Sequence, residues 1–221
     1  MNKPFKFYYE NYKDVIKSGY QLMHGIWKIN SMAGPIVTIF GGARWHKSPY
    51  QQQAHDLASL LINHNISVIT GGGPGIMEAA NCGAAEAIKK TNSKAKSIGI
   101  TVKGLEREVL NTCAREQLSV DTFLVRKWLM VEYSVAFAVF PGGFGTIDEL
   151  GEVLTLMQTK KLAGVPVVLF GSLYWQPFLD WVQGTLLKNN IVSQSDVELF
   201  KVTDSIEEAL ILLKERCDIC E

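Results

Sequence analysis

Short apolar runs alternate with longer segments that carry one apolar face, from residue 35 onward. Runs such as "PIVTIF" and "SIGITV" are rich in β-branched residues, and we expect them to be buried strands. The predicted strands cover 35–40, 66–70, 97–102, 137–140, 165–170 and, at a sheet edge, 198–202. The segments between them have the spacing of amphipathic helices, at 48–65, 75–90, 126–136, 146–161, 174–187 and 205–217.

This alternation predicts the fold class. Apolar strands separated by helices form a parallel sheet that is covered on both faces. Right-handed crossovers then give an α/β, Rossmann-like, doubly wound parallel sheet, which we expect to be a single domain over 35–221. Residues 1–34 are predicted to be an N-terminal helical extension, whose aromatic residues indicate packing on this domain or on a partner subunit. Residues 103–120 are polar and are predicted to be irregular.

Three glycine-bearing turns follow predicted strands, at 40–44, 70–78 and 140–146. The carboxyl ends of parallel strands meet at one edge of the sheet, where ligands bind in such folds. The turn "TGGGPG" opens a helix, so its glycines and free N–H groups can bind phosphate, and a turn that serves packing alone is the alternative. The turn is neither a Walker A loop nor G-x-G-x-x-G, which favours a mononucleotide or sugar phosphate over a dinucleotide.

The third turn, "PGGFGTIDEL", continues at once into two carboxylates. Residues 146–149 fit a capping box, in which Thr146 caps the helix and Glu149 reaches back to its N–H. The alternative is a catalytic Glu149. Arg126 and Lys127 begin the helix before the same strand, and a basic pair at this edge favours an anionic ligand with chemistry beside it. A solvated helix end is the alternative for these two residues.

The composition and charge of the chain argue against several classes of binding partner. The 221 residues carry 22 basic and 22 acidic side chains, so no net field attracts nucleic acid or an anionic membrane. No apolar stretch reaches ~18 residues, and the N-terminus lacks the apolar centre of a signal peptide, which together predict a cytoplasmic protein. The 4 cysteines and 4 histidines lack zinc spacing, so we expect no metal, and Cys217 and Cys220 are interpreted as ordinary thiols.

Several motifs together resemble those of the LOG (Lonely Guy) family, the cytokinin riboside 5′-monophosphate phosphoribohydrolases, many of which are labelled "lysine decarboxylase-like". "PGGFGTIDE" matches the family signature PGGxGTxxE, and "RK" at 126–127 matches its partner motif. The resemblance extends over about residues 35–185, where "GGGPGIMEAAN" and "ELGEVLTLMQTKK" are similar to the longer bacterial branch.

The resemblance implies a homodimer or higher homo-oligomer that cleaves the N-glycosidic bond of a nucleoside 5′-monophosphate. The substrate would be AMP or an N6-substituted cytokinin nucleotide, the products a free base and ribose 5-phosphate, and no cofactor would be needed. It implies Glu149 and Arg126 as the catalytic pair. Binding positions, including the candidates from the second glycine turn, are Gly72, Gly73, Gly75, Glu108, Lys127, Gly142, Gly143, Gly145, Thr146, Asp148 and Thr155. The family's usual Gly-Ser pair is replaced in "FGGAR", so Arg44 has no implied role.

The reaction would pass through an oxocarbenium-like state, which a carboxylate such as Glu149 can stabilise while it orients or deprotonates water. Arg126 would hold Glu149 ionised or bond the ribose or base, because a guanidinium is a poor proton donor. One alternative is a nucleosidase of broad base specificity. Another is a nucleotide-binding sensor or carrier without hydrolysis. Decarboxylation would ordinarily require pyridoxal phosphate on a buried lysine, and the sequence gives no lysine such a setting.

Overall fold

The computed structural model describes residues 3–45, 48–104, 111–114, 116–162 and 164–217. Across these residues, seven parallel strands form one sheet in the order β4-β3-β2-β1-β5-β6-β7. The strands are β1 (Ile36–Phe40), β2 (Ser67–Thr70), β3 (Ser97–Val102), β4 (Glu116–Val120), β5 (Ala136–Val139), β6 (Val167–Phe170) and β7 (Lys201–Thr203). The predicted doubly wound α/β fold is confirmed.

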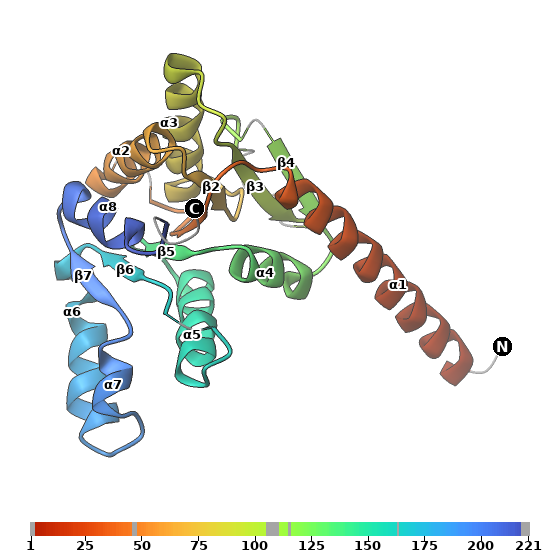
Figure 1. Cartoon of the computed structure of the whole chain (residues 1–221). Coiled ribbons are helices and arrows are strands. Elements are labelled where there is room, and N and C mark those ends of the chain that lie inside the picture. Colours follow the sequence, from red (N-terminus) through yellow and green to blue (C-terminus); the bar gives the residue numbers. More distant parts are fainter. Residues whose placement is uncertain (1–2, 46–47, 105–110, 115, 163, 218–221) are drawn as a thin grey trace.

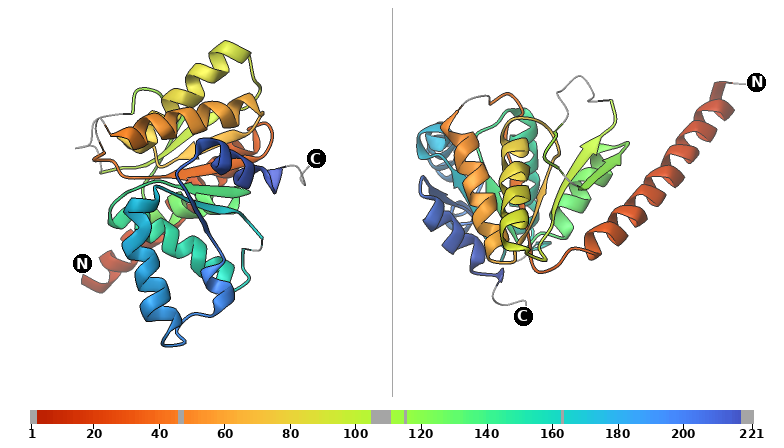
Figure 2. Two further views of the ribbon diagram at one scale, coloured as in Figure 1. Left: turned by 90° about the vertical axis from the view of Figure 1, so that its left-hand side faces the viewer. Right: turned by 90° about the horizontal axis from the view of Figure 1, so that it is seen from above.

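Helices cover both faces of the sheet (Figure 1). They are α1 (Lys3–Asn30), α2 (Pro49–Asn63), α3 (Ile76–Thr91), α4 (Phe123–Glu132), α5 (Phe144–Gln158), α6 (Ser172–Trp181), the π-helix η1 (Val182–Leu187), α7 (Gln194–Val197) and α8 (Ile206–Lys214). One layer holds α2, α3 and α8, and the other holds α4, α5 and α6 (Figure 2). Alternate residues of β1 serve the two layers, since Val37 and Ile39 pack under the first and Ile36 and Phe40 under the second.

The order of the strands reverses between β1 and β5. Successive strands run outward from β1 to β4 on one side, and the chain then returns to add β5, β6 and β7 on the other. The backbone registers Val37 with Ala136 and Phe40 with Val139, so both strands end at the same height. A crevice opens beyond the carboxyl ends of strands at such a reversal, and this is where open α/β sheets bind ligands.

Several elements differ from those that the sequence predicts, strand β4 and helix α4 among them. The segment 103–120 was expected to be irregular, but its last five residues form the edge strand β4. An edge strand needs few apolar side chains, and here only Leu118 and Val120 are buried, so no continuous apolar run marks it. Helix α4 also begins earlier than predicted, at Phe123, because the Thr122 side chain accepts a hydrogen bond from the Val125 N–H.

The long helix α1 extends away from the rest of the molecule toward the N-terminus (Figure 1). Its C-terminal part packs on α4, where Ile29 is buried and Gly25 lies against Leu129. Its aromatic residues Tyr20 and Trp27 are exposed, so they do not pack on the domain, and packing on a partner subunit stays a prediction. Over the part of the chain that is described, no helix combines the length and apolar character required to cross a bilayer.

Candidate functional site

A pocket of about 1060 Å³ opens at the reversal of the strand order. Turns that follow β1, β2, β3 and β5 line it, as expected for the carboxyl edge of a parallel sheet. All three predicted glycine turns therefore meet in one place. The lining residues that carry polar groups from the turns and helices include Arg44, Asn111, Gln117, Arg126, Thr146 and Glu149.

The turn after β5 leaves its backbone amides available to a ligand. Helix α5 begins at Phe144, and its first hydrogen bond runs from the Ile147 N–H to the Gly143 carbonyl at 3.1 Å. The amides of residues 144–146 therefore have no acceptor within the helix. Gly142 has no room for a side chain, since an added Cβ would lie 2.0 Å from the Thr146 Oγ1. These features support an anion site at the predicted glycines.

The predicted capping box is wrong. Gly143, rather than Thr146, is the N-cap of α5, and no side chain caps the helix. Thr146 therefore lies in the first helical turn, buried against Gly142. Because the N-cap lies three residues earlier than the pattern indicated, Glu149 is too far along the helix to reach the N-cap amide. Its carboxylate faces helix α4 instead.

The turn after β2 uses its own amides internally. The Gly72 N–H donates to Thr70 Oγ1 at 3.1 Å, and the Ile76 N–H donates to the Gly42 carbonyl at 3.2 Å. Gly72 and Gly73 line the pocket, whereas Gly75 packs against the turn after β1. Two of the amides at this turn are therefore already engaged within the protein.

Arg126 and Glu149 form a buried ion pair inside the pocket. The Arg126 Nη2 lies 3.2 Å from Glu149 Oε1, and the two side chains are only 10% and 11% exposed. Burial raises the pKa of Glu149 to about 7, and the positive charge of Arg126 opposes part of that rise. A carboxyl that changes charge near neutral pH, in a pocket, is suited to acid–base work.

The guanidinium of Arg126 retains capacity for a ligand. It lines the pocket, whereas its Nε is buried and has no hydrogen-bond partner among the described residues. Gly71 makes room for this group, since an added Cβ would meet the Arg126 Nη2 at 1.9 Å. The ring of Phe123 lies beneath the guanidinium, 5.9 Å from it. Gly71 thus serves the placement of Arg126, a role that the sequence did not reveal.

Lys127 and Asp148 lie outside this pocket. They face a second hollow of about 380 Å³, together with Glu152 and Thr155. Lys127 Nζ is 3.1 Å from Asp148 and 2.6 Å from Glu152. The structure therefore does not bring Lys127, Asp148 and Thr155 into the pocket that holds the Arg126–Glu149 pair, and their predicted contact with a ligand stays a prediction.

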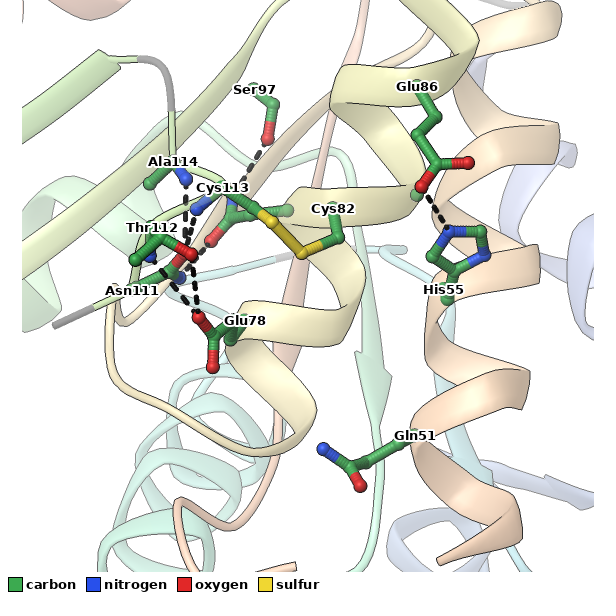
Figure 3. The surroundings of a disulfide bond; sticks show 12 residues. Gln51, His55, Glu78, Cys82, Glu86, Ser97, Asn111, Thr112, Cys113 and Ala114 are labelled. Carbon is green, nitrogen blue, oxygen red and sulfur yellow. Dashed lines mark hydrogen bonds and ion pairs between the residues drawn. A yellow bond between two sulfur atoms is a disulfide. The ribbon is translucent and has the colours of Figure 1, made fainter. Parts of the chain in front are cut away.

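A disulfide between Cys82 and Cys113 links helix α3 to the wall of the pocket that contains Asn111 (Figure 3). Close by, the Asn111 amide donates to Asn81 Oδ1 at 2.8 Å and to the Gly73 carbonyl at 3.3 Å. Gln117, another residue of this wall, donates to the Asn111 carbonyl. Nothing in the spacing of the cysteines indicated the pair, because it joins residues 31 apart in sequence, with strand β3 between them.

The other residues that the sequence analysis named lie in different parts of the structure. Glu108 lies outside the described residues, as does Cys220. Arg44 lines the pocket, beside Trp45, which the sequence did not single out. Within the described ranges, no three His, Cys, Asp or Glu side chains form a group that could hold a metal ion.

Comparisons with known sequences converge on one family. Residues 77–213 match the model of the family described as "possible lysine decarboxylase". The cytokinin riboside 5′-monophosphate phosphoribohydrolases LOG3 and LOG4 of Arabidopsis thaliana are each 35% identical to the chain, over 125 and 130 residues. These matches cover 56% and 58% of this chain and 55% and 58% of the two relatives. The chain thus spans little more than half the length of these curated relatives.

Solved structures share the fold at lower sequence identity. A molybdenum cofactor binding protein from Rippkaea orientalis is 21% identical with a TM-score of 0.60, and the match covers 86% of this chain and all of that one. The molybdenum cofactor carrier protein of Chlamydomonas reinhardtii is 20% identical with a TM-score of 0.59, covering 83% and 99%. At this identity the similarity shows the fold alone.

Proposed function

The chain belongs to the family described as "possible lysine decarboxylase", whose curated members include the phosphoribohydrolases above, and we propose that it cleaves the N-glycosidic bond of a nucleoside 5′-monophosphate. The products would be a free base, adenine or an N6-substituted adenine, and ribose 5-phosphate. The substrate class is inferred from the activity named for these relatives and from the chemistry of the pocket.

One observation carries the proposal. A buried carboxylate and a set of free backbone amides lie on the same helix and face the same pocket. With a rise of about 1.5 Å per residue, Glu149 lies roughly one helical turn beyond the amides of residues 144–146. A site that cleaves a nucleoside monophosphate needs donors for the phosphate and a carboxylate about one sugar ring away from them. Its phosphate binds the amides, and its C1′ atom, one sugar ring away, reaches the carboxylate.

Glu149 is proposed as the catalytic residue. Cleavage places positive charge on the ribose ring, which an ionised Glu149 stabilises while it orients or deprotonates the attacking water. The bond from C1′ to the base nitrogen breaks, water supplies the new oxygen at C1′, and the base leaves with a proton from solvent. Arg126 favours the ionised form of Glu149, and its guanidinium, which lines the pocket, can bond the ribose or the base.

The family's descriptive label names a different reaction, which the pocket residues do not support. A decarboxylase that uses pyridoxal phosphate needs a lysine whose amine can form a Schiff base. Lys103 lines the pocket, but its side chain is 53% exposed and pairs with Asp121 at 3.3 Å. An exposed lysine in an ion pair does not have the buried setting that a Schiff-base lysine requires.

A panel of nucleoside monophosphates tests the proposal. The protein is incubated with the monophosphates of adenine, isopentenyladenine, guanine and the pyrimidines, and free base is measured by chromatography. We expect adenine or isopentenyladenine to be released in equal amount to ribose 5-phosphate, and Glu149→Ala to release neither. Tight binding of a nucleotide with no release of base would instead support the sensor or carrier alternative. Release from every member would support a broad nucleosidase.

A further inference from the structure

The peptide between Gly142 and Gly143 is held by a side chain from a distant part of the chain. Tyr174, in the first turn of α6, donates a hydrogen bond from its hydroxyl to the Gly142 carbonyl. A trans peptide directs its C=O and its N–H to opposite sides. The Gly143 N–H therefore points away from Tyr174. Gly143 lines the pocket and Tyr174 does not, so this N–H is directed toward the pocket.

The peptide groups on either side of this one are held by contacts that do not involve Tyr174. The preceding carbonyl, of Pro141, already accepts a hydrogen bond from the Gly42 N–H at 3.0 Å. The following amides belong to helix α5. Gly143 itself gives little steric restraint, since a Cβ added there would meet no atom within 4 Å. Without the tyrosine hydroxyl, the peptide between two glycines could rotate and turn its N–H away from the pocket.

Tyr174 is well placed for this role because its ring is fixed on two sides. It packs edge-on against Trp45, with ring centroids 6.1 Å apart, and against Trp175 at 5.0 Å. The start of α6 is also anchored, because the Ser172 N–H donates to Asp204 at 2.8 Å. The hydroxyl therefore reaches the glycine turn from a rigid base rather than from a mobile loop.

We propose that Tyr174 is a positioning residue for the 5′-phosphate of the substrate. Its hydroxyl fixes the Gly142–Gly143 peptide so that the Gly143 N–H joins the amides of α5 in binding the phosphate oxygens. The inference rests on the proposed function for the identity of the ligand. Because Tyr174 acts only on the phosphate end of the site, it sets the preference for a nucleotide over the corresponding nucleoside.

The test measures binding separately from turnover. In a Glu149→Gln background, which prevents hydrolysis, calorimetry gives the Kd of AMP, ribose 5-phosphate and adenosine. Adding Tyr174→Phe should raise the Kd of AMP and of ribose 5-phosphate about tenfold, because the peptide loses the one hydrogen bond that holds it in place. The affinity for adenosine should stay within about twofold.

Tyr50→Phe is the matched control. Tyr50 belongs to the same aromatic cluster, with its ring 5.6 Å from that of Trp45, but its hydroxyl makes no hydrogen bond to the described residues. Its loss should leave all three affinities within about twofold. Thermal unfolding of both variants shows whether either change loosens the fold.

The possible results separate this inference from the proposed function. An unchanged affinity for AMP in Tyr174→Phe overturns the inference, and so does an equal loss for AMP and adenosine, which would indicate general loosening. Failure of the background protein to bind either phosphate compound overturns the phosphate site itself. If wild type releases no base but Tyr174→Phe still weakens AMP selectively, the hydrolase proposal fails and the role of Tyr174 stands.

Discussion

Two of the ion pairs that join helices α4 and α5 lie one residue apart on each helix, and their carboxylates differ in burial. Arg126 and Glu149 are about nine-tenths buried and face the large pocket. Lys127 and Asp148 lie outside it, and the Asp148 side chain is 64% exposed. The sequence places the four residues in two adjoining pairs, one in each of two motifs, and the fold divides them between two environments.

The difference shows how burial, rather than charge alone, creates reactive groups. Burial raises the pKa of Glu149 to about 7 although Arg126 is 3.2 Å away. The second pair acts on Glu149 with opposite signs, since Asp148 raises its pKa and Lys127 lowers it. Lys127 is itself only 19% exposed, so only the carboxylate of this pair is well solvated. We infer that the Arg126–Glu149 pair carries the chemistry and that the Lys127–Asp148 pair mainly joins the two helices.

The largest expected effect is on the pH dependence of folding stability. The folded pKa of Glu149, about 7, lies above its ordinary value of 4.5, so between these pH values the native state holds a proton that the unfolded state loses. Raising the pH from 5 to 8 should therefore cost wild type roughly 3 kcal/mol of stability that Glu149→Gln does not lose. Denaturant unfolding of both proteins at the two pH values measures this difference.

Asp148→Asn is the control for this measurement. Because Asp148 is exposed, its replacement should change the same difference by less than about 0.5 kcal/mol. Parallel pH dependences of wild type and Glu149→Gln would show that Glu149 is not the buried titrating group.

The next prediction distinguishes the role of Arg126 from that of Lys127. Replacing Arg126 with Met removes the charge that opposes the raised pKa of Glu149, so more of the carboxyl is protonated at neutral pH. We expect kcat/KM for AMP to fall about 100-fold, with the pH profile shifted to higher pH. Lys127→Met should lose less than about threefold. Equal losses in the two variants would remove the distinction between the pairs.

A smaller effect is the pH dependence of wild-type turnover. If the ionised form of Glu149 is active, kcat/KM should rise about tenfold per pH unit below about 7 and level above it. The substrate phosphate also titrates, near pH 6. The Kd of AMP for Glu149→Gln over the same range reports that second titration alone. If kcat/KM of wild type changed with pH only as far as the Kd of AMP does, Glu149 would not be the titrating group.

The fold could be predicted from the sequence wherever apolar periodicity was strong. The strand at 97–102 matches its predicted bounds, because a buried strand leaves a continuous apolar run. Strand β4 was missed because it lies at the edge of the sheet, where few side chains are buried.

The candidate site was only partly predictable. The three turns and the Arg126–Glu149 pair follow from sequence motifs and strand order. Contacts between distant segments do not, as for the Cys82–Cys113 disulfide and the bond from Tyr174 to Gly142. The apparent capping box misled for a related reason. A glycine with extended backbone, Gly143, began helix α5 without any side-chain cap, so the pattern T-x-x-E had no bearing on the helix start.

The most direct test of the account compares neighbouring carboxylates on one helix. Wild type, Asp148→Asn and Glu149→Gln are incubated with AMP at pH 8, and adenine and ribose 5-phosphate are measured together. We predict that wild type and Asp148→Asn release both products in equal amounts at rates within about threefold, whereas Glu149→Gln is slower by at least about 1000-fold. Comparable rates for Glu149→Gln and wild type, or a loss confined to Asp148→Asn, would contradict the assignment of the chemistry to the buried pair.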